Sequence, residues 1–114
     1  MPGTNKEILN RLTHGVLTMK KLAPKVSEGF FALDKAGTEA GALDNKTKEL
    51  IALALGVAAR CDGCIAVHVN NCVKAGASVE EIAETLGVAV SMGGGPSMVY
   101  ATRALEALAE FTAK

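Results

Sequence analysis

Apolar residues recur along this chain at the three- and four-residue spacing of amphipathic helices, and no segment alternates convincingly with the two-residue period of a strand. Thr4 and Glu7 form the two ends of a capping box near the start of the chain, a pattern typical of a helix N-terminus. Ile8 and Leu12 then follow at helical spacing. The pattern predicts a first helix that runs to about Lys21.

Capping residues, prolines and glycines divide the rest of the chain into five further helices. The residues that mark their expected starts are Pro24, Asp44, Cys61, Ser78 with Glu81, and Pro96. The residues that mark the expected ends of the first four of them are Gly37 with Gly41, Ala59, Gly76 and Met92. We therefore predict an all-α fold of about six helices in a single domain over residues 1–114.

The third and fourth predicted helices form the centre of this fold. The run Leu50–Leu55 is apolar nearly all round, which predicts a buried central helix. If the two helices make an antiparallel hairpin that turns near Ala59, Glu49 and His68 face one another, because they are about equally far from the turn. A buried carboxylate is costly unless it is paired, and His68 is a natural partner. The alternative is an exposed Glu49 that pairs with a neighbouring lysine.

Composition narrows the class of partner. Twelve Lys and Arg residues balance twelve Asp and Glu residues, which argues against nucleic acid and against an anionic membrane surface, because both attract a basic surplus. No apolar run reaches the ~18 residues of a membrane-spanning helix, and residues 1–5 do not open a secretory signal. We therefore expect a cytoplasmic protein with neither a nucleic acid nor a membrane as partner.

The cysteines suggest redox chemistry. Their number, three, does not fit the disulfide framework of a small secreted domain. One stripe of the fourth predicted helix holds four residues at intervals of three, four and four: Cys61, Cys64, His68 and Cys72. Cys61 and Cys64 are neighbours at the helix start, where the helix N-terminus stabilises a thiolate. His68 lies one turn beyond Cys64, within reach of its proton. The spacing therefore predicts a redox dithiol.

Two other interpretations of this stripe stay open. Three Cys and one His are also zinc ligands, but the helix from Cys61 to Cys72 spans roughly 16 Å, whereas zinc–ligand bonds measure about 2.0–2.3 Å. We therefore expect no bound metal. The Cys61–Cys64 pair is alternatively two small buried hydrophobic residues, which is how Cys72 is best explained.

The pattern E-x11-C-x2-C-x3-H, made by Glu49, Cys61, Cys64 and His68, resembles the alkyl hydroperoxidase D (AhpD)-like branch of the carboxymuconolactone decarboxylase family. The resemblance covers residues 25–112 and is to the short single-domain members. It implies an all-helical subunit that dimerises and often builds a hexamer as a trimer of dimers. It also implies an alkylhydroperoxidase-like enzyme with thiol peroxidase and disulfide reductase activity.

By position in the family pattern, Cys64 is the peroxidatic cysteine, Cys61 is the resolving cysteine, and Glu49 and His68 are the proton relay. The substrate is then a peroxide or a disulfide, the reductant is a dithiol that is often carried by a lipoyl-bearing protein, and no cofactor is needed. One departure concerns the substrate. Some peroxidase members of the family carry a second histidine directly before the inner cysteine, where this chain has Gly63.

Two alternative functions use the same residues differently. In a cofactor-free decarboxylase or lyase of the carboxymuconolactone type, Glu49 and His68 act as acid and base and both cysteines are incidental. Decarboxylase members of the family lack the dithiol, which disfavours this alternative. In a redox-regulated, chaperone-like interaction protein, the dithiol acts as a switch for the binding of clients.

Overall fold

The computed structural model describes residues 3–113, so that residues 1, 2 and 114 of the predicted domain lie outside the described part. Within that part the chain forms helices and no strand, which confirms the all-α prediction. The helices are α1 (Asn5–Leu22), α2 (Pro24–Thr38), α3 (Asn45–Ala58), α4 (Asp62–Lys74), α5 (Val79–Gly93) and α6 (Gly95–Thr112).

Local capping explains why the predicted boundaries agree with the observed ones. The backbone N–H of Glu7 donates to Thr4 Oγ1 over 3.1 Å, and the second capping box, at the start of α5, has the same geometry. Gly76 follows α4 with a φ of +85°, a conformation that favours glycine after a helix end. α2 ends at Thr38, between Gly37 and Gly41, which mark its predicted end.

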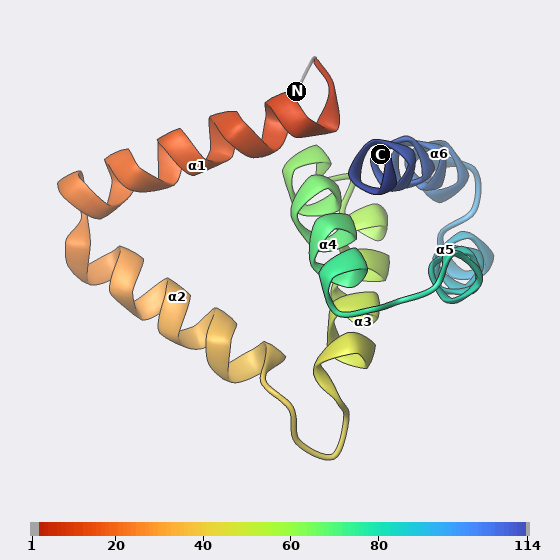
Figure 1. Cartoon of the computed structure of the whole chain (residues 1–114), viewed down its shortest axis with the longest axis horizontal. Coiled ribbons are helices and arrows are strands. Elements are labelled where there is room, and N and C mark those ends of the chain that lie inside the picture. The colour runs from red at the N-terminus through yellow and green to blue at the C-terminus, as the bar shows by residue number, and fades with distance from the viewer. Residues whose placement is uncertain (1–2, 114) are drawn as a thin grey trace.

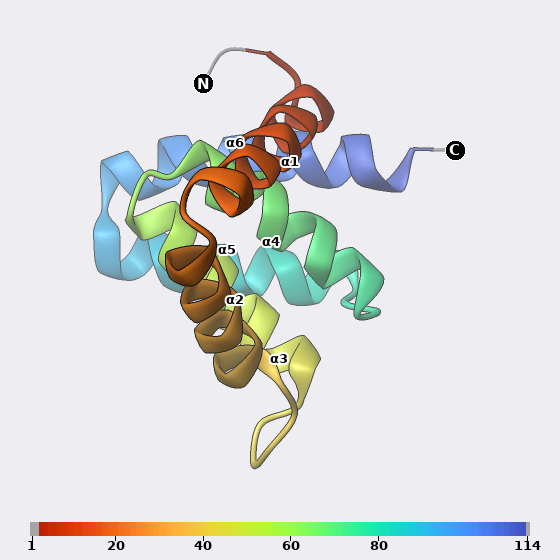
Figure 2. The ribbon, with the colours of Figure 1, turned by 90° about the vertical axis from the view of Figure 1, so that its left-hand side faces the viewer.

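Four helices build the body of the subunit and two build an arm. Figure 1 shows α3, α4, α5 and α6 packed together, with α1 and α2 standing out from them and meeting at an elbow. Figure 2 shows this arm in front of the body. α1 contacts α4 and α6, while Ser27 is the buried residue of α2. Phe30 and Leu33 of α2 are 58% and 71% exposed, so this apolar helix is largely uncovered in a single copy.

The hydrophobic core lies between the four helices of the body. Its buried members are Leu53, Val57, Ile65, Val69, Cys72, Ile82, Leu86, Ala89, Ala101, Ala104, Ala107 and Leu108. Three of the α6 members are alanines, and small side chains let that helix approach its neighbours closely. No helix within residues 3–113 is long and apolar enough to cross a membrane.

The two faces of α3 differ, which shows that the prediction of a helix buried all round was wrong. Leu53 and Val57 are fully buried in the core. Ile51 and Leu55, on the other side, are 45% and 65% exposed. The physical reason is the position of α2, which leaves an open groove lined by Leu33, Ile51 and Leu55. Only one side of the apolar run Leu50–Leu55 therefore packs into the core of a single copy.

The predicted antiparallel hairpin of α3 and α4 is confirmed. Its turn is short because the Cys61 N–H donates to the Gly56 carbonyl over 3.1 Å, and Arg60 adopts a left-handed φ of +56°. Gly56 also allows the two helices to meet at the start of α4. A Cβ added at Gly56 would lie 3.1 Å from Cβ of Cys64.

Candidate functional site

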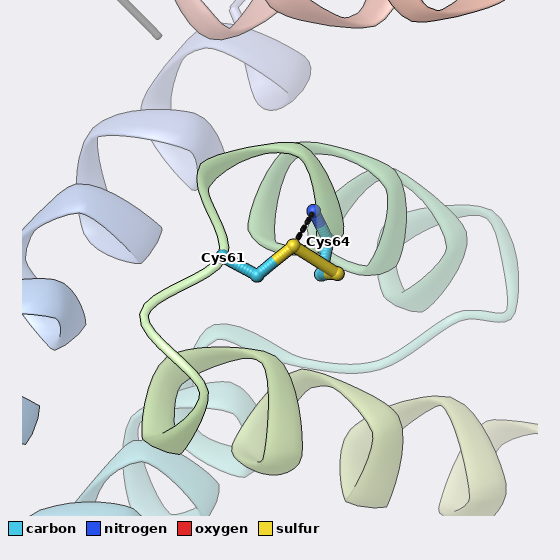
Figure 3. Close-up of a disulfide and its surroundings, with 2 residues drawn as sticks. All are labelled: Cys61 and Cys64. Atoms are coloured by element: carbon cyan, nitrogen blue, oxygen red, sulfur yellow. Dashed lines mark hydrogen bonds between the residues drawn. A yellow bond between two sulfur atoms is a disulfide. The ribbon is translucent and has the colours of Figure 1, made fainter.

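Cys61 and Cys64 form a disulfide at the start of α4, with Cα atoms 5.2 Å apart (Figure 3). Cys61 is the N-cap of the helix, and its Sγ accepts the backbone N–H of Cys64 over 3.1 Å. Sulfur therefore takes the place that a serine or aspartate oxygen usually has in a cap. A thiolate at Cys61 would receive the same hydrogen bond and the partial positive charge of the helix end.

Glu49 of α3 and His68 of α4 form the second part of the site. The Glu49 Oε1 atom lies 2.8 Å from Nδ1 of His68, so the predicted pairing across the hairpin is confirmed. Glu49 is only 6% exposed. The alternative of an exposed Glu49 paired with a lysine is wrong, because Lys46 pairs with Glu81 over 2.8 Å and Lys48 donates to the Glu39 carbonyl.

This pairing determines which nitrogen of the His68 imidazole carries the proton. A carboxylate oxygen only accepts, so the neutral ring that binds Glu49 carries its proton on Nδ1. The Nε2 atom then holds the lone pair and can act as a base. Cys64 precedes His68 by one helical turn, so that the two side chains lie on one face of α4.

Sequence reasoning missed Asn71, which also contacts Glu49. Its Nδ2 donates to Glu49 Oε1 over 3.3 Å, the same oxygen that binds His68. The only signal in the sequence was its spacing of three residues from His68, which places both on one side of α4. A polar residue at helical spacing is common on any exposed face, so this signal does not single out Asn71.

Cys72, the third cysteine, is a free thiol that is fully buried in the core, as predicted. Burial, together with the nearby charge of Glu49, raises the pKa of Cys72 to about 12. The thiol therefore stays neutral at physiological pH and lacks the thiolate that redox chemistry requires.

Helix α1 covers the dithiol turn on another side. A Cβ added at Gly63 would lie 3.0 Å from Cδ1 of Leu12, so a larger residue there must displace that side chain. Beside this contact, Arg103 of α6 forms an ion pair with Asp62 and lies 4.5 Å from the Tyr100 ring centre. Asp62, Tyr100 and Arg103 border an open cleft of about 480 Å³ next to the start of α4.

The side chains of residues 3–113 form no cluster suited to a metal ion. In the described part of the chain, no three His, Cys, Asp or Glu side chains gather in a way that could hold a metal ion. Cys61 and Cys64 bind one another, and Cys72 lies in the core. What the arrangement can do chemically is to form and break a disulfide beside a carboxylate–imidazole pair.

Comparisons with solved structures identify similar subunits. A carboxymuconolactone decarboxylase family protein from Legionella pneumophila is 50% identical, with a TM-score of 0.93 over 95% of this chain and 96% of that one. A family member from Thermotoga maritima, for which a role in antioxidative response has been suggested, is 36% identical, with a TM-score of 0.81 over 90% and 87% of the two chains.

Comparisons of sequence agree with this similarity. An uncharacterised protein from Cupriavidus necator is 40% identical over 72% of this chain and 73% of its own length. An uncharacterised protein of the cox locus in Paracoccus denitrificans is 39% identical over 75% and 77% of the two chains. The family sequence profile matches residues 24–107, which include the dithiol, Glu49 and His68. This chain belongs to the carboxymuconolactone decarboxylase family.

Proposed function

We propose that the protein is a thiol-dependent peroxidase and disulfide reductase of the AhpD type. The observation that carries this proposal is the Cys61–Cys64 disulfide at a helix N-terminus, one turn from an imidazole that a buried carboxylate holds. The resemblance of the full motif to the AhpD-like branch supports it. The role in antioxidative response suggested for the Thermotoga maritima relative supports it as well.

The two cysteines have different surroundings, which supports different roles. Cys64 lies one turn before His68, so we assign to it the attack on the substrate, with Nε2 of His68 as the base that takes its proton. Cys61 has the hydrogen bond from the Cys64 N–H, which stabilises a thiolate on the resolving sulfur. Glu49 stabilises the imidazolium that forms when His68 is protonated.

The oxidative half of the reaction then runs in two steps. The Cys64 thiolate attacks the terminal oxygen of a hydroperoxide, the O–O bond breaks, and the alkoxide leaves with the proton that His68 took from Cys64. Cys64 is thereby oxidised to a sulfenic acid. The Cys61 thiol loses its proton as its sulfur attacks the Cys64 sulfur, the S–O bond breaks, and the departing hydroxide takes up that proton and leaves as water while the disulfide forms. This disulfide is the state that the structure contains.

A dithiol reductant completes the cycle. One of its thiolates attacks the Cys61–Cys64 disulfide and forms a mixed disulfide, and its second thiol closes on the first and releases the reduced protein. The reductant is oxidised to its own disulfide, so that two electrons pass in each cycle. A lipoyl-bearing protein fits this role, because a lipoyl group presents two thiols on one arm. No metal or dissociable cofactor takes part.

Quantification of thiols after one equivalent of an organic hydroperoxide tests the proposal. The reduced wild type should lose two thiols, Cys64→Ser none, and Cys61→Ser should keep a sulfenic acid or mixed disulfide. Cys72→Ala is the matched control, because it removes the buried cysteine outside the proposed cycle, and it should behave as wild type. Undiminished peroxide consumption by Cys64→Ser would contradict the mechanism.

The exposed arm supports a homo-oligomer, which we propose to be a dimer or a trimer of dimers as the family resemblance implies. Val26, Phe30 and Leu33 of α2 are exposed in a single copy, and such apolar surface is typical of a subunit interface. Sedimentation equilibrium should give a multiple of the subunit mass. Phe30→Ser should lower that mass, whereas Glu28→Ser on the same helix should not. A monomeric wild type would contradict this assembly.

A further inference from the structure

Glu49 has two hydrogen-bond donors from α4, and both meet the same atom. His68 Nδ1 lies 2.8 Å and Asn71 Nδ2 lies 3.3 Å from Glu49 Oε1. His68 and Asn71 are three residues apart, so the helix places them side by side opposite α3. Asn71 thus donates a second hydrogen bond to the carboxylate of the Glu49–His68 pair, to which we assign proton transfer.

We propose that Asn71 is a positioning residue, which holds the Glu49 carboxylate toward Nδ1 of His68 and thereby sets how readily Cys64 loses its proton. Asn71 acts through Glu49 and touches no reacting atom. The inference rests on the proposed function, because it concerns the same relay. It goes beyond the family motif, which contains the Glu, the two Cys and the His but not this asparagine.

Burial explains why Glu49 needs a second donor. The carboxylate is almost out of contact with water, and a buried charge is costly unless hydrogen bonds replace the lost solvent. An amide that donates to a carboxylate favours its charged, acceptor-only form. With Asn71 in place, Oε1 accepts two hydrogen bonds, and the bond from Asn71 helps to hold it beside Nδ1 of His68. Without it, Glu49 has one bond to orient it and is freer to rotate away from the imidazole.

Several other charged groups on these helices make their contacts elsewhere, so they do not substitute for Asn71. Cys72 is a neutral thiol close enough to Glu49 to be affected by its charge. Lys46 pairs with Glu81, Lys48 donates to the Glu39 carbonyl, Asp62 pairs with Arg103, and Glu110 accepts from Asn5. Arg11 also makes a contact.

The adjacent Asn70 provides a matched control for the experiment. It is the same residue type on the same helix, it is also half-buried, and its one-residue offset points it about 100° away from Asn71. Asn71→Leu removes the donor and keeps the volume, and Asn71→Ala removes the donor without adding apolar bulk. Asn70→Leu and Asn70→Ala impose the same changes away from Glu49. Circular dichroism identifies the variants that fold.

The measurement is the rate at which iodoacetamide alkylates Cys64 in the fully reduced protein, followed against pH and located by mass spectrometry. No peroxide is needed. In both Asn71 variants the half-maximal rate should move to higher pH, and the rate at neutral pH should fall about three- to tenfold, because less of Cys64 is thiolate. Nitrogen NMR of the ring should show loss of the Nδ1–H tautomer of His68. Both Asn70 variants should match wild type.

The outcomes separate this inference from the proposed function. One outcome is that Cys64 is alkylated no faster in the wild type than in the double variant Cys61→Ser,His68→Ala. This would show that His68 does not activate Cys64, and it would contradict the proposed function itself. A wild-type protein with an activated Cys64, together with Asn71 variants whose pH profile and tautomer are unchanged, would overturn the role of Asn71 alone. Equal shifts in the Asn70 and Asn71 variants would also overturn it.

Discussion

At Gly56, the structure should reverse the effect on stability that helix propensity alone predicts for a change to alanine. This glycine lies inside α3, where glycine costs roughly 0.5–1 kcal/mol relative to alanine. Gly56→Ala should therefore stabilise an isolated helix. In the fold, however, the new Cβ would lie 3.1 Å from Cβ of Cys64 and 3.7 Å from the Ile65 nitrogen. Both atoms belong to or adjoin the α4 backbone, so no change of rotamer relieves the contact.

The expected magnitude follows from these two opposing terms. Overpacking of a close helix contact costs about 1–3 kcal/mol, against the roughly 0.5–1 kcal/mol gained from propensity. Gly56→Ala should therefore lower the free energy of unfolding by about 0–2.5 kcal/mol. Gly87→Ala, in α5, is the matched control, because a Cβ there meets nothing within 4 Å. It should raise the free energy of unfolding by about 0.5–1 kcal/mol.

Urea unfolding followed by circular dichroism, at one fixed protein concentration, measures both variants. The two free energies should differ by about 1–3 kcal/mol, which is the cost of the contact itself. In Gly56→Ala, the new Cβ should displace α4 and thereby slow alkylation of reduced Cys64. In Gly87→Ala, the alkylation rate should be unchanged. If Gly56→Ala stabilises the protein as much as Gly87→Ala does, the close approach of α3 and α4 at Cys64 does not constrain the site.

Three further outcomes are expected. Arg60→Gly should raise the free energy of unfolding in urea by about 0.5–1 kcal/mol, because glycine adopts the left-handed turn without strain, and Arg60→Ala should give no such gain. Cys72 should resist iodoacetamide in the folded protein at about pH 8 and react once urea unfolds it, because its pKa of about 12 keeps the thiol protonated. Glu49→Gln should slow Cys64 alkylation at neutral pH about tenfold or more, because it removes the charge that supports protonated His68.

Local chemistry explains the features that the sequence predicted well. A capping box needs only residues three apart, so the starts of α1 and α5 could be located from Thr4–Glu7 and Ser78–Glu81. The contact between Glu49 and His68 required one further assumption, an antiparallel hairpin with a short turn. Once that turn is placed, helical rise alone brings the two residues to the same level.

The features that the sequence did not predict depend on how helices rotate and tilt against one another. The bond from Asn71 to Glu49 requires the exact roll of α4 on α3, which hydrophobic spacing does not define to within one residue. The contact of Leu12 with Gly63 requires α1 to pack across the start of α4, which lies about fifty residues later in the chain. The exposure of Ile51 and Leu55 arises because α2 stands away from the body, which the composition of α3 does not reveal.

Two glycines explain how the dithiol turn is held. Gly56 lets α3 approach Cys64 from one side, and Gly63 lets Leu12 of α1 approach from another. With helices close on both sides, the first turn of α4 has little freedom to shift. The Cα atoms of Cys61 and Cys64 lie 5.2 Å apart, within the usual 4.4–6.8 Å range for a disulfide. Because the surrounding backbone fixes that separation, we expect the disulfide to open and close by movement of the sulfur atoms rather than of the helices, so that the Glu49–His68 pair keeps its contact through the proposed cycle.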